Sequence, residues 1–101
     1  MSECIDVMNG VANNVKSIDK PWLLYDLADY IYLYVRMTSP CLVDFDIDLD
    51  IFDEKRATLI IIVKHRDGTV VGEVPVAGEV TMQEDLVFFK PVKANVVKTR
   101  G

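Results

Sequence analysis

The chain has 101 residues, of which 50% are hydrophobic and 27% are charged. This length and composition predict one globular domain, residues 1–101, with its own core, and exclude a disordered chain. All sixteen acidic residues precede residue 86, and the last sixteen residues carry four basic residues and no acid. An acidic body repels phosphates, so we expect neither direct nucleic-acid binding nor membrane binding.

The two cysteines, Cys4 and Cys41, lie far apart in the sequence and among apolar residues. A scaffold held together by disulfides would need more cysteines in a chain this short, so we expect two buried free thiols. The first ten residues show no basic segment followed by an apolar one, and no run of about 18 apolar residues occurs. These features predict a protein without a membrane span in a reducing compartment, the cytoplasm.

Two helices are predicted in the first forty residues. Residues 3–15 place apolar side chains at helical spacing, although Gly10 weakens this helix. The second helix, residues 20–36, has Asp19 as its N-cap and Pro21 in its first turn, and the Thr-Ser-Pro segment that follows ends it. This second helix is apolar on nearly every side, which favours cover from more than one direction.

From residue 41 onward the hydrophobic period changes from 3.6 to 2. We predict strands at 42–52, 58–66, 69–76 and 86–97, with a tight hairpin turn at Asp67-Gly68 and a loop over 77–85. Pro75 and Pro91 favour strand ends or sheet edges. The expected fold is α+β, with two N-terminal helices packed on one face of a three- to four-stranded antiparallel meander.

The stretch "VDFDIDLDIFD" (43–53) alternates apolar and acidic residues. On a strand, Asp44, Asp46, Asp48 and Asp50 point to one face, and the apolar residues between them point to the other. We expect the apolar set to face the helices and the aspartates to face solvent. A symmetric turn at 53–57 places the four aspartates, in the order given, opposite Arg66, Lys64, Ile62 and Ile60.

Three interpretations of this row of aspartates are open. The plainest is a solvated face whose acids are partly paired with bases. A second is imitation of a nucleic-acid backbone, because alternate strand residues lie about 6.6 Å apart. Inhibitors of this kind are typical of viruses and mobile elements. A third is divalent-metal binding, which parallel strand carboxylates suit poorly, because calcium requires converging oxygens and the glycine and glutamate of an EF-hand loop are missing.

Aromatic residues cover several sides of the second predicted helix. Most of them fit a core, but tyrosine and tryptophan also supply large contact areas with a polar tip. We therefore expect some of Trp22, Tyr25, Tyr32 and Leu33 to form the interface of a homodimer.

Residues for catalysis, metals or cofactors are sparse. His65 is the one histidine, and nothing local predicts that Cys4 or Cys41 lies near it, so we expect a satisfied histidine at the edge of the inner face. No nucleophile elbow, P-loop or dinucleotide fingerprint occurs. We expect no enzyme activity, no catalytic or metal site and no cofactor.

Residues 57–75, "ATLIIIVKHRDGTVVGEVP", resemble the closing hairpin of FlaG-type flagellar proteins, in which a strand, an acidic-Gly turn and an Ile/Val-Pro end recur. The resemblance implies a hairpin there and is not carried further. The sequence thus predicts a small, acidic, non-enzymatic protein that binds itself and a second, unidentified protein, with nucleic-acid mimicry as the alternative and a metal-binding protein or enzyme as the third.

Overall fold

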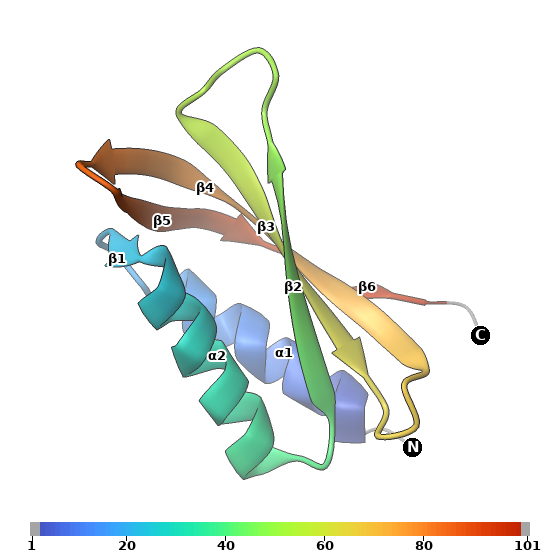
Figure 1. Ribbon diagram of the computed structural model, residues 1–101. Coiled ribbons are helices and arrows are strands. Elements are labelled where there is room, and N and C mark those ends of the chain that lie inside the picture. Colours follow the sequence, from blue (N-terminus) through green and yellow to red (C-terminus); the bar gives the residue numbers. More distant parts are fainter. Residues whose placement is uncertain (1–2, 100–101) are drawn as a thin grey trace.

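The computed structural model describes residues 3–99, which form two helices and one antiparallel sheet (Figure 1). The expected α+β class is confirmed, but the sheet has more strands than predicted and a short strand separates the helices. The helices are α1 (Glu3–Lys16) and α2 (Leu24–Thr38). The strands are β1 (Trp22–Leu23), β2 (Leu42–Leu49), β3 (Arg56–Lys64), β4 (Val70–Gln83), β5 (Leu86–Ala94) and β6 (Val97–Lys98). The sheet order is β1-β5-β4-β3-β2, and β6 pairs with β4.

Both helices pack on one face of the sheet, and the core lies between the helices and that face. Helix α1 buries one side at helical spacing, and α2 buries Leu27, Ile31 and Val35. The sheet supplies alternate residues from β3, β4 and β5. The largest fully buried side chains of the sheet are Phe89, Ile61, Val63, Val74 and Val76.

Helix α2 begins later than its sequence predicts. Asp19 and Pro21 precede it, and no side-chain cap is present at its first turn, where Leu23 is the N-cap. Instead, Trp22 and Leu23 pair with Phe89 and Phe88 as β1. Pairing with the sheet satisfies backbone groups that an additional helical turn would otherwise have bonded internally.

Strand β4 is longer than predicted, because the expected loop at 77–85 is mostly strand. The chain reverses at Glu84-Asp85, where Glu84 has a φ of 58°, and Gln83 pairs with Leu86. Glutamate is not typical of a positive φ, so the turn was not recognisable in the sequence. Pro75 lies inside β4 and not at its end. On that side of β4, the pairing with β6 ends at Glu73 and the pairing with β5 begins at Val76, so Pro75 lies in the gap between the two.

The strands extend further than the helices, and this difference in length determines the shape of the molecule. Helix α2 has 15 residues and β4 has 14. A helix rises about 1.5 Å per residue and a strand about 3.3 Å, so the strands extend about twice as far. The ends of the β2–β3 and β4–β5 hairpins therefore project beyond the helices (Figure 1), and the molecule measures 42 × 26 × 22 Å.

Candidate functional site

The alternation predicted for 43–49 is present in β2. Val43 is buried and Phe45 is half-buried on the helix side, whereas Asp44, Asp46 and Asp48 are exposed. Strand β2 is an edge strand, because β3 is the one strand that pairs with it within residues 3–99. The acidic row therefore follows one margin of the sheet.

The predicted register of this row is wrong. Asp44 lies opposite Ile62, Asp46 opposite Ile60, and Asp48 opposite Thr58. Each aspartate faces a residue four positions earlier than expected, because the turn between β2 and β3 is centred two residues earlier in the chain than predicted.

Aspartate side chains hold the connection between β2 and β3 in place. Asp50 Oδ1 accepts a hydrogen bond from the Phe52 backbone N–H at 2.8 Å, and Asp53 Oδ1 accepts one from the Lys55 N–H at 3.0 Å. These local bonds compete with continuation of the strand. Asp50 consequently lies outside β2, and the row on the strand consists of Asp44, Asp46 and Asp48.

One member of the row has a basic partner. The carboxylate of Asp44 forms an ion pair with the ammonium group of Lys64, diagonally across from it on β3. Among the described residues, Asp46 and Asp48 form no ion pair. Like charges directly opposite each other destabilise a strand pair, so this row disfavours antiparallel pairing of β2 with β2 of another copy. The plainest interpretation is therefore a protected sheet edge.

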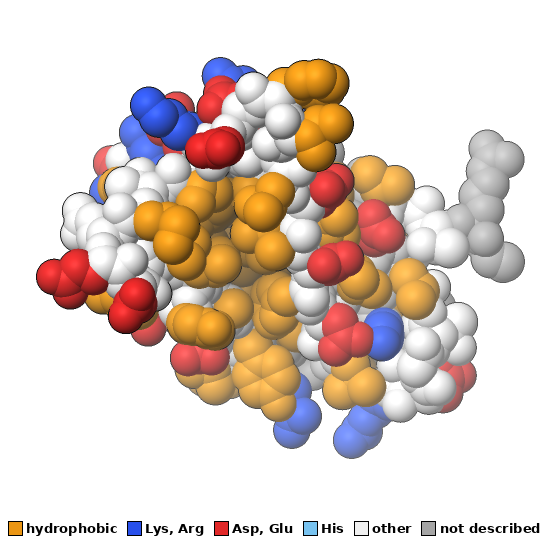
Figure 2. Space-filling model, turned by 45° about the horizontal axis from the view of Figure 1, so that its top comes forward, with side chains coloured by type: hydrophobic (Ala, Val, Ile, Leu, Met, Phe, Trp, Pro, Cys, Tyr) orange, Lys and Arg blue, Asp and Glu red, His pale blue; other side chains and the backbone are white. Residues whose placement is uncertain are grey.

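The projecting hairpin ends expose hydrophobic side chains, one of which, Ile51, was expected to face the helices. Ile51 is 86% and Phe52 is 92% exposed. Figure 2 brings this end of the molecule forward and shows hydrophobic side chains gathered around a hollow, with charged side chains toward the margins. We give the name hairpin surface to exposed hydrophobic residues of the two hairpin ends: Ile47, Leu49, Ile51, Phe52 and Met82.

Sequence reasoning missed the hairpin surface. The alternation of β2 correctly separates its two faces, but it carries no information on where the helices stop covering the inner face. Had β4 been predicted at its full length, the projection of the β4–β5 hairpin beyond the helices would have been expected. The turn at Glu84, which was not recognised in the sequence, prevented this prediction.

Beside this end, on the other face of the sheet, lies a depression of about 400 Å³. Asp48, Asp50 and Glu79 line it together with Arg56 and Val92. Three acidic side chains against one basic side chain give the depression a net negative lining.

The outward side of α2 carries three of the four residues predicted for a dimer interface, and the fourth, Trp22, lies in β1. Tyr25 is 79% and Leu33 is 55% exposed, and Tyr32 is also exposed, with the Arg36 guanidinium 5.9 Å from its ring centroid. Trp22 differs from these three, because it is half-buried and its ring meets Tyr30 edge-on at 5.4 Å. Within residues 3–99, α2 is covered on one side, not on several.

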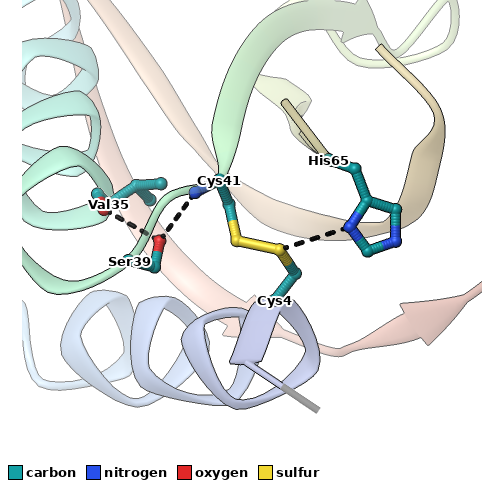
Figure 3. Close-up of a disulfide and its surroundings, with 5 residues drawn as sticks. All are labelled: Cys4, Val35, Ser39, Cys41 and His65. Atoms are coloured by element: carbon teal, nitrogen blue, oxygen red, sulfur yellow. Dashed lines mark hydrogen bonds between the residues drawn. A yellow bond between two sulfur atoms is a disulfide. The ribbon is translucent and has the colours of Figure 1, made fainter. Parts of the chain in front are cut away.

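The prediction of free thiols is wrong, because Cys4 and Cys41 form a disulfide with a Cα–Cα distance of 5.9 Å (Figure 3). Both residues are buried, as expected. The disulfide joins the first turn of α1 to the residue before β2. His65 also lies here, with its Nδ1 3.8 Å from Cys4 Sγ, although nothing in the sequence places it near a cysteine.

The β3–β4 turn next to His65 is well bonded. The His65 N–H donates to the Thr69 carbonyl at 2.8 Å and Gly68 has a φ of 92°, so the turn has three residues where two were expected. The Thr69 backbone N–H, which donates to Asp67 Oδ1 at 2.9 Å, lowers the pKa of Asp67, and the Thr69 hydroxyl and His65 lower it further. A bulge at Val71 follows, and Val70 is exposed.

Across residues 3–99, no helix is long and apolar enough to cross a membrane. In the same range, no group of three or more His, Cys, Asp or Glu side chains is arranged to hold a metal ion. Comparison with protein-family models, with curated proteins and with solved structures gives no match for this chain.

Proposed function

We propose that this protein acts without catalysis, by binding other macromolecules, and that it forms a homodimer through the outward side of α2. The observation that supports this is the number of large hydrophobic side chains exposed on α2 and on the hairpin surface. Monomeric proteins seldom expose apolar patches of this kind, which are typical of interaction sites.

The side of α2 suits a pair of identical helices. Tyr25, Tyr32 and Leu33 follow one side of the helix, together with exposed Met37. Asp26 and Asp29 lie near the start of α2, and Arg36 lies in its last turn. A two-fold axis that pairs two copies antiparallel brings Arg36 of each beside the acids of the other.

Two lysine substitutions of comparable exposure test this interface. Leu33→Lys places a charge on the outward side of α2, and Leu86→Lys places one at the β4–β5 turn, where Leu86 is 48% exposed. We expect Leu33→Lys to raise the dimer dissociation constant at least tenfold in light scattering and Leu86→Lys to leave it unchanged. Equal effects of the two variants would contradict the assignment of the interface.

The hairpin surface is the proposed site for a second protein. Its apolar centre and charged margin match the usual anatomy of an interface. Affinity capture from the native host with Phe52→Ser should recover less partner than capture with wild type. Val97→Ser, which removes an exposed hydrophobic residue outside both the hairpin surface and the α2 interface, serves as the control. Loss of the partner from both variants alike would count against the hairpin surface.

Nucleic-acid mimicry is the second candidate. Asp46 and Asp48 support it, because they are exposed on an edge strand and have no ion pair within the described part of the chain. Their replacement with Asn should abolish the capture of basic nucleic-acid enzymes if the row is a mimic, and should change neither dimerisation nor capture under the main proposal. A melting temperature that rises with Ca²⁺ or Mn²⁺ would instead favour a metal-binding role for the row.

We propose the cytoplasm as the compartment of this protein. The expected free thiols do not support it, because the structure has a disulfide. In the cytoplasm, thioredoxin and glutathione keep most thiols reduced. A cytoplasmic location therefore means that Cys4 and Cys41 are in their reduced state for most of the life of the protein.

A further inference from the structure

Every cysteine and histidine of the chain lies at one place. The sequence contains two cysteines and one histidine. Cys4 belongs to α1, Cys41 immediately precedes β2 and His65 immediately follows β3, yet Figure 3 shows all three side chains converging. The imidazole turns its Nδ1 toward the sulfur of Cys4, and its other nitrogen points away.

The distances suit a zinc ion once the sulfurs separate. Zinc binds thiolate at about 2.3 Å and imidazole at about 2.0–2.1 Å in tetrahedral geometry, which sets the sulfur and nitrogen ligands about 3.6 Å apart. The observed separation of Cys4 Sγ and His65 Nδ1 is 3.8 Å. While the sulfurs are bonded to each other they cannot act as thiolate ligands, in agreement with the lack of a metal-holding group among residues 3–99.

We propose that reduction of the disulfide converts this place into a zinc site formed by Cys4, Cys41 and His65. A dithiol reductant supplies two electrons and two protons, so the disulfide becomes two thiols and the reductant becomes a disulfide. Zn²⁺ then replaces the two thiol protons, which pass to solvent, and neutral His65 supplies the lone pair of Nδ1. Water takes the fourth position, as in other sites with three protein ligands.

The surrounding structure holds the ligands in place before the metal binds. Two turn hydrogen bonds fix the backbone of His65, and the Cys41 N–H donates to Ser39 Oγ at 3.2 Å. Ser39 Oγ in turn donates to the Val35 carbonyl at 2.9 Å. Cys4 lies in the first turn of α1, where the helix dipole favours the negative charge of a thiolate. Zinc therefore binds a site that loses little additional conformational freedom.

The site has a structural consequence. The disulfide ties α1 to β2 in an oxidising environment, and the zinc ion provides the same tie, with β3 added, in a reducing one. Binding of zinc to the folded chain stabilises it by mass action. This inference concerns the fold in a reducing compartment and is independent of the proposed interaction surfaces.

The test uses the full chain, reduced with dithiothreitol and freed of reductant under anaerobic conditions. Titration with Zn²⁺ against a chromogenic chelator should give one ion per reduced chain and none per oxidised chain. Co²⁺ as the probe should give the absorption of a tetrahedral ion and a thiolate charge-transfer band. A reduced chain that binds no Zn²⁺ at micromolar concentration would overturn the proposal.

Variants distinguish zinc binding at this site from nonspecific zinc binding by two thiols. We expect Cys4→Ser to abolish tetrahedral Co²⁺ binding and His65→Gln to weaken Zn²⁺ binding at least tenfold, whereas the neighbouring Arg66→Gln has no effect. Unchanged affinity in His65→Gln would contradict the assignment. If the reduced chain unfolds, recovery of its helical circular dichroism with Zn²⁺ supports the site, and failure to recover overturns it.

Discussion

At the scale of single residues, Gly78 and Phe89 show how closely the core is packed. Phe89 is fully buried. A Cβ on Gly78 would contact the Phe89 ring and lie 2.6 Å from the Lys90 carbonyl oxygen, which is backbone and cannot turn aside. The absence of a side chain at position 78 is thus what allows the Phe89 ring to cross β4.

Gly78→Ala should therefore destabilise the protein by about 1–3 kcal/mol, because the added methyl group forces the buried ring or the strand to move. Ala77→Ser, at the exposed neighbouring position, should change the free energy of unfolding by less than about 0.5 kcal/mol. Urea unfolding of both variants measures the difference. Equal stability of Gly78→Ala and wild type would show that the ring has more room than the structure gives it.

A pH dependence follows from Asp67. The hydrogen bond from the Thr69 backbone N–H lowers its pKa below the ordinary value of 3.8 in the folded state. A lowered folded-state pKa contributes stability that is present above the unfolded-state pKa and lost as the pH falls through the folded value. Wild type should therefore be more stable than Asp67→Asn at neutral pH, and the difference should shrink below about pH 4.

Urea unfolding of wild type and Asp67→Asn at about pH 7 and about pH 2.5 checks this dependence. A difference in free energy of unfolding that stays constant between the two pH values would contradict a lowered pKa. Asn retains an oxygen that can accept the Thr69 hydrogen bond, so the comparison isolates the charge.

At the scale of elements, the local sequence pattern predicts those helices and strands whose limits do not depend on partners distant in the sequence. Helix α1 was predicted at 3–15 and observed at Glu3–Lys16, and the period of two located β3. The α2 start and the far half of β4 depend on partners distant in sequence, since β1 pairs with β5 and Glu84 forms the turn between β4 and β5. Local propensity does not contain those partners.

The disulfide is a link between elements that local pattern did not predict, because its two cysteines are 37 positions apart in the sequence. Closing a loop of that length stabilises the native state by about 3–4 kcal/mol in the chain-entropy account. The double variant Cys4→Ser with Cys41→Ser should be less stable than oxidised wild type by about that amount.

Denaturant unfolding with and without reductant measures this contribution. In reductant and in the presence of a zinc chelator, wild type and the double variant should have similar free energies of unfolding, which is the matched control. A double variant as stable as the oxidised wild type would show that the cross-link contributes nothing to folding.

At the scale of the whole molecule, the main consequence of the fold is surface that the helices leave uncovered. The sequence predicts which face of β2 is apolar, and the structure agrees at Val43 and Phe45. It does not predict that Ile51 is exposed, because exposure depends on the relative lengths and positions of helices and strands. Likewise, parity located Asp46 and Asp48 on the outer face but not their opposite residues, because the position of the β2–β3 turn sets the register.

Sedimentation equilibrium of the wild-type chain across a dilution series tests self-association, the central claim of this account, most directly. We predict a mass of twice 11.4 kDa at high concentration that falls toward 11.4 kDa on dilution. The exposed residues of α2 supply the contact. A mass of 11.4 kDa at every concentration up to the solubility limit would contradict the claim.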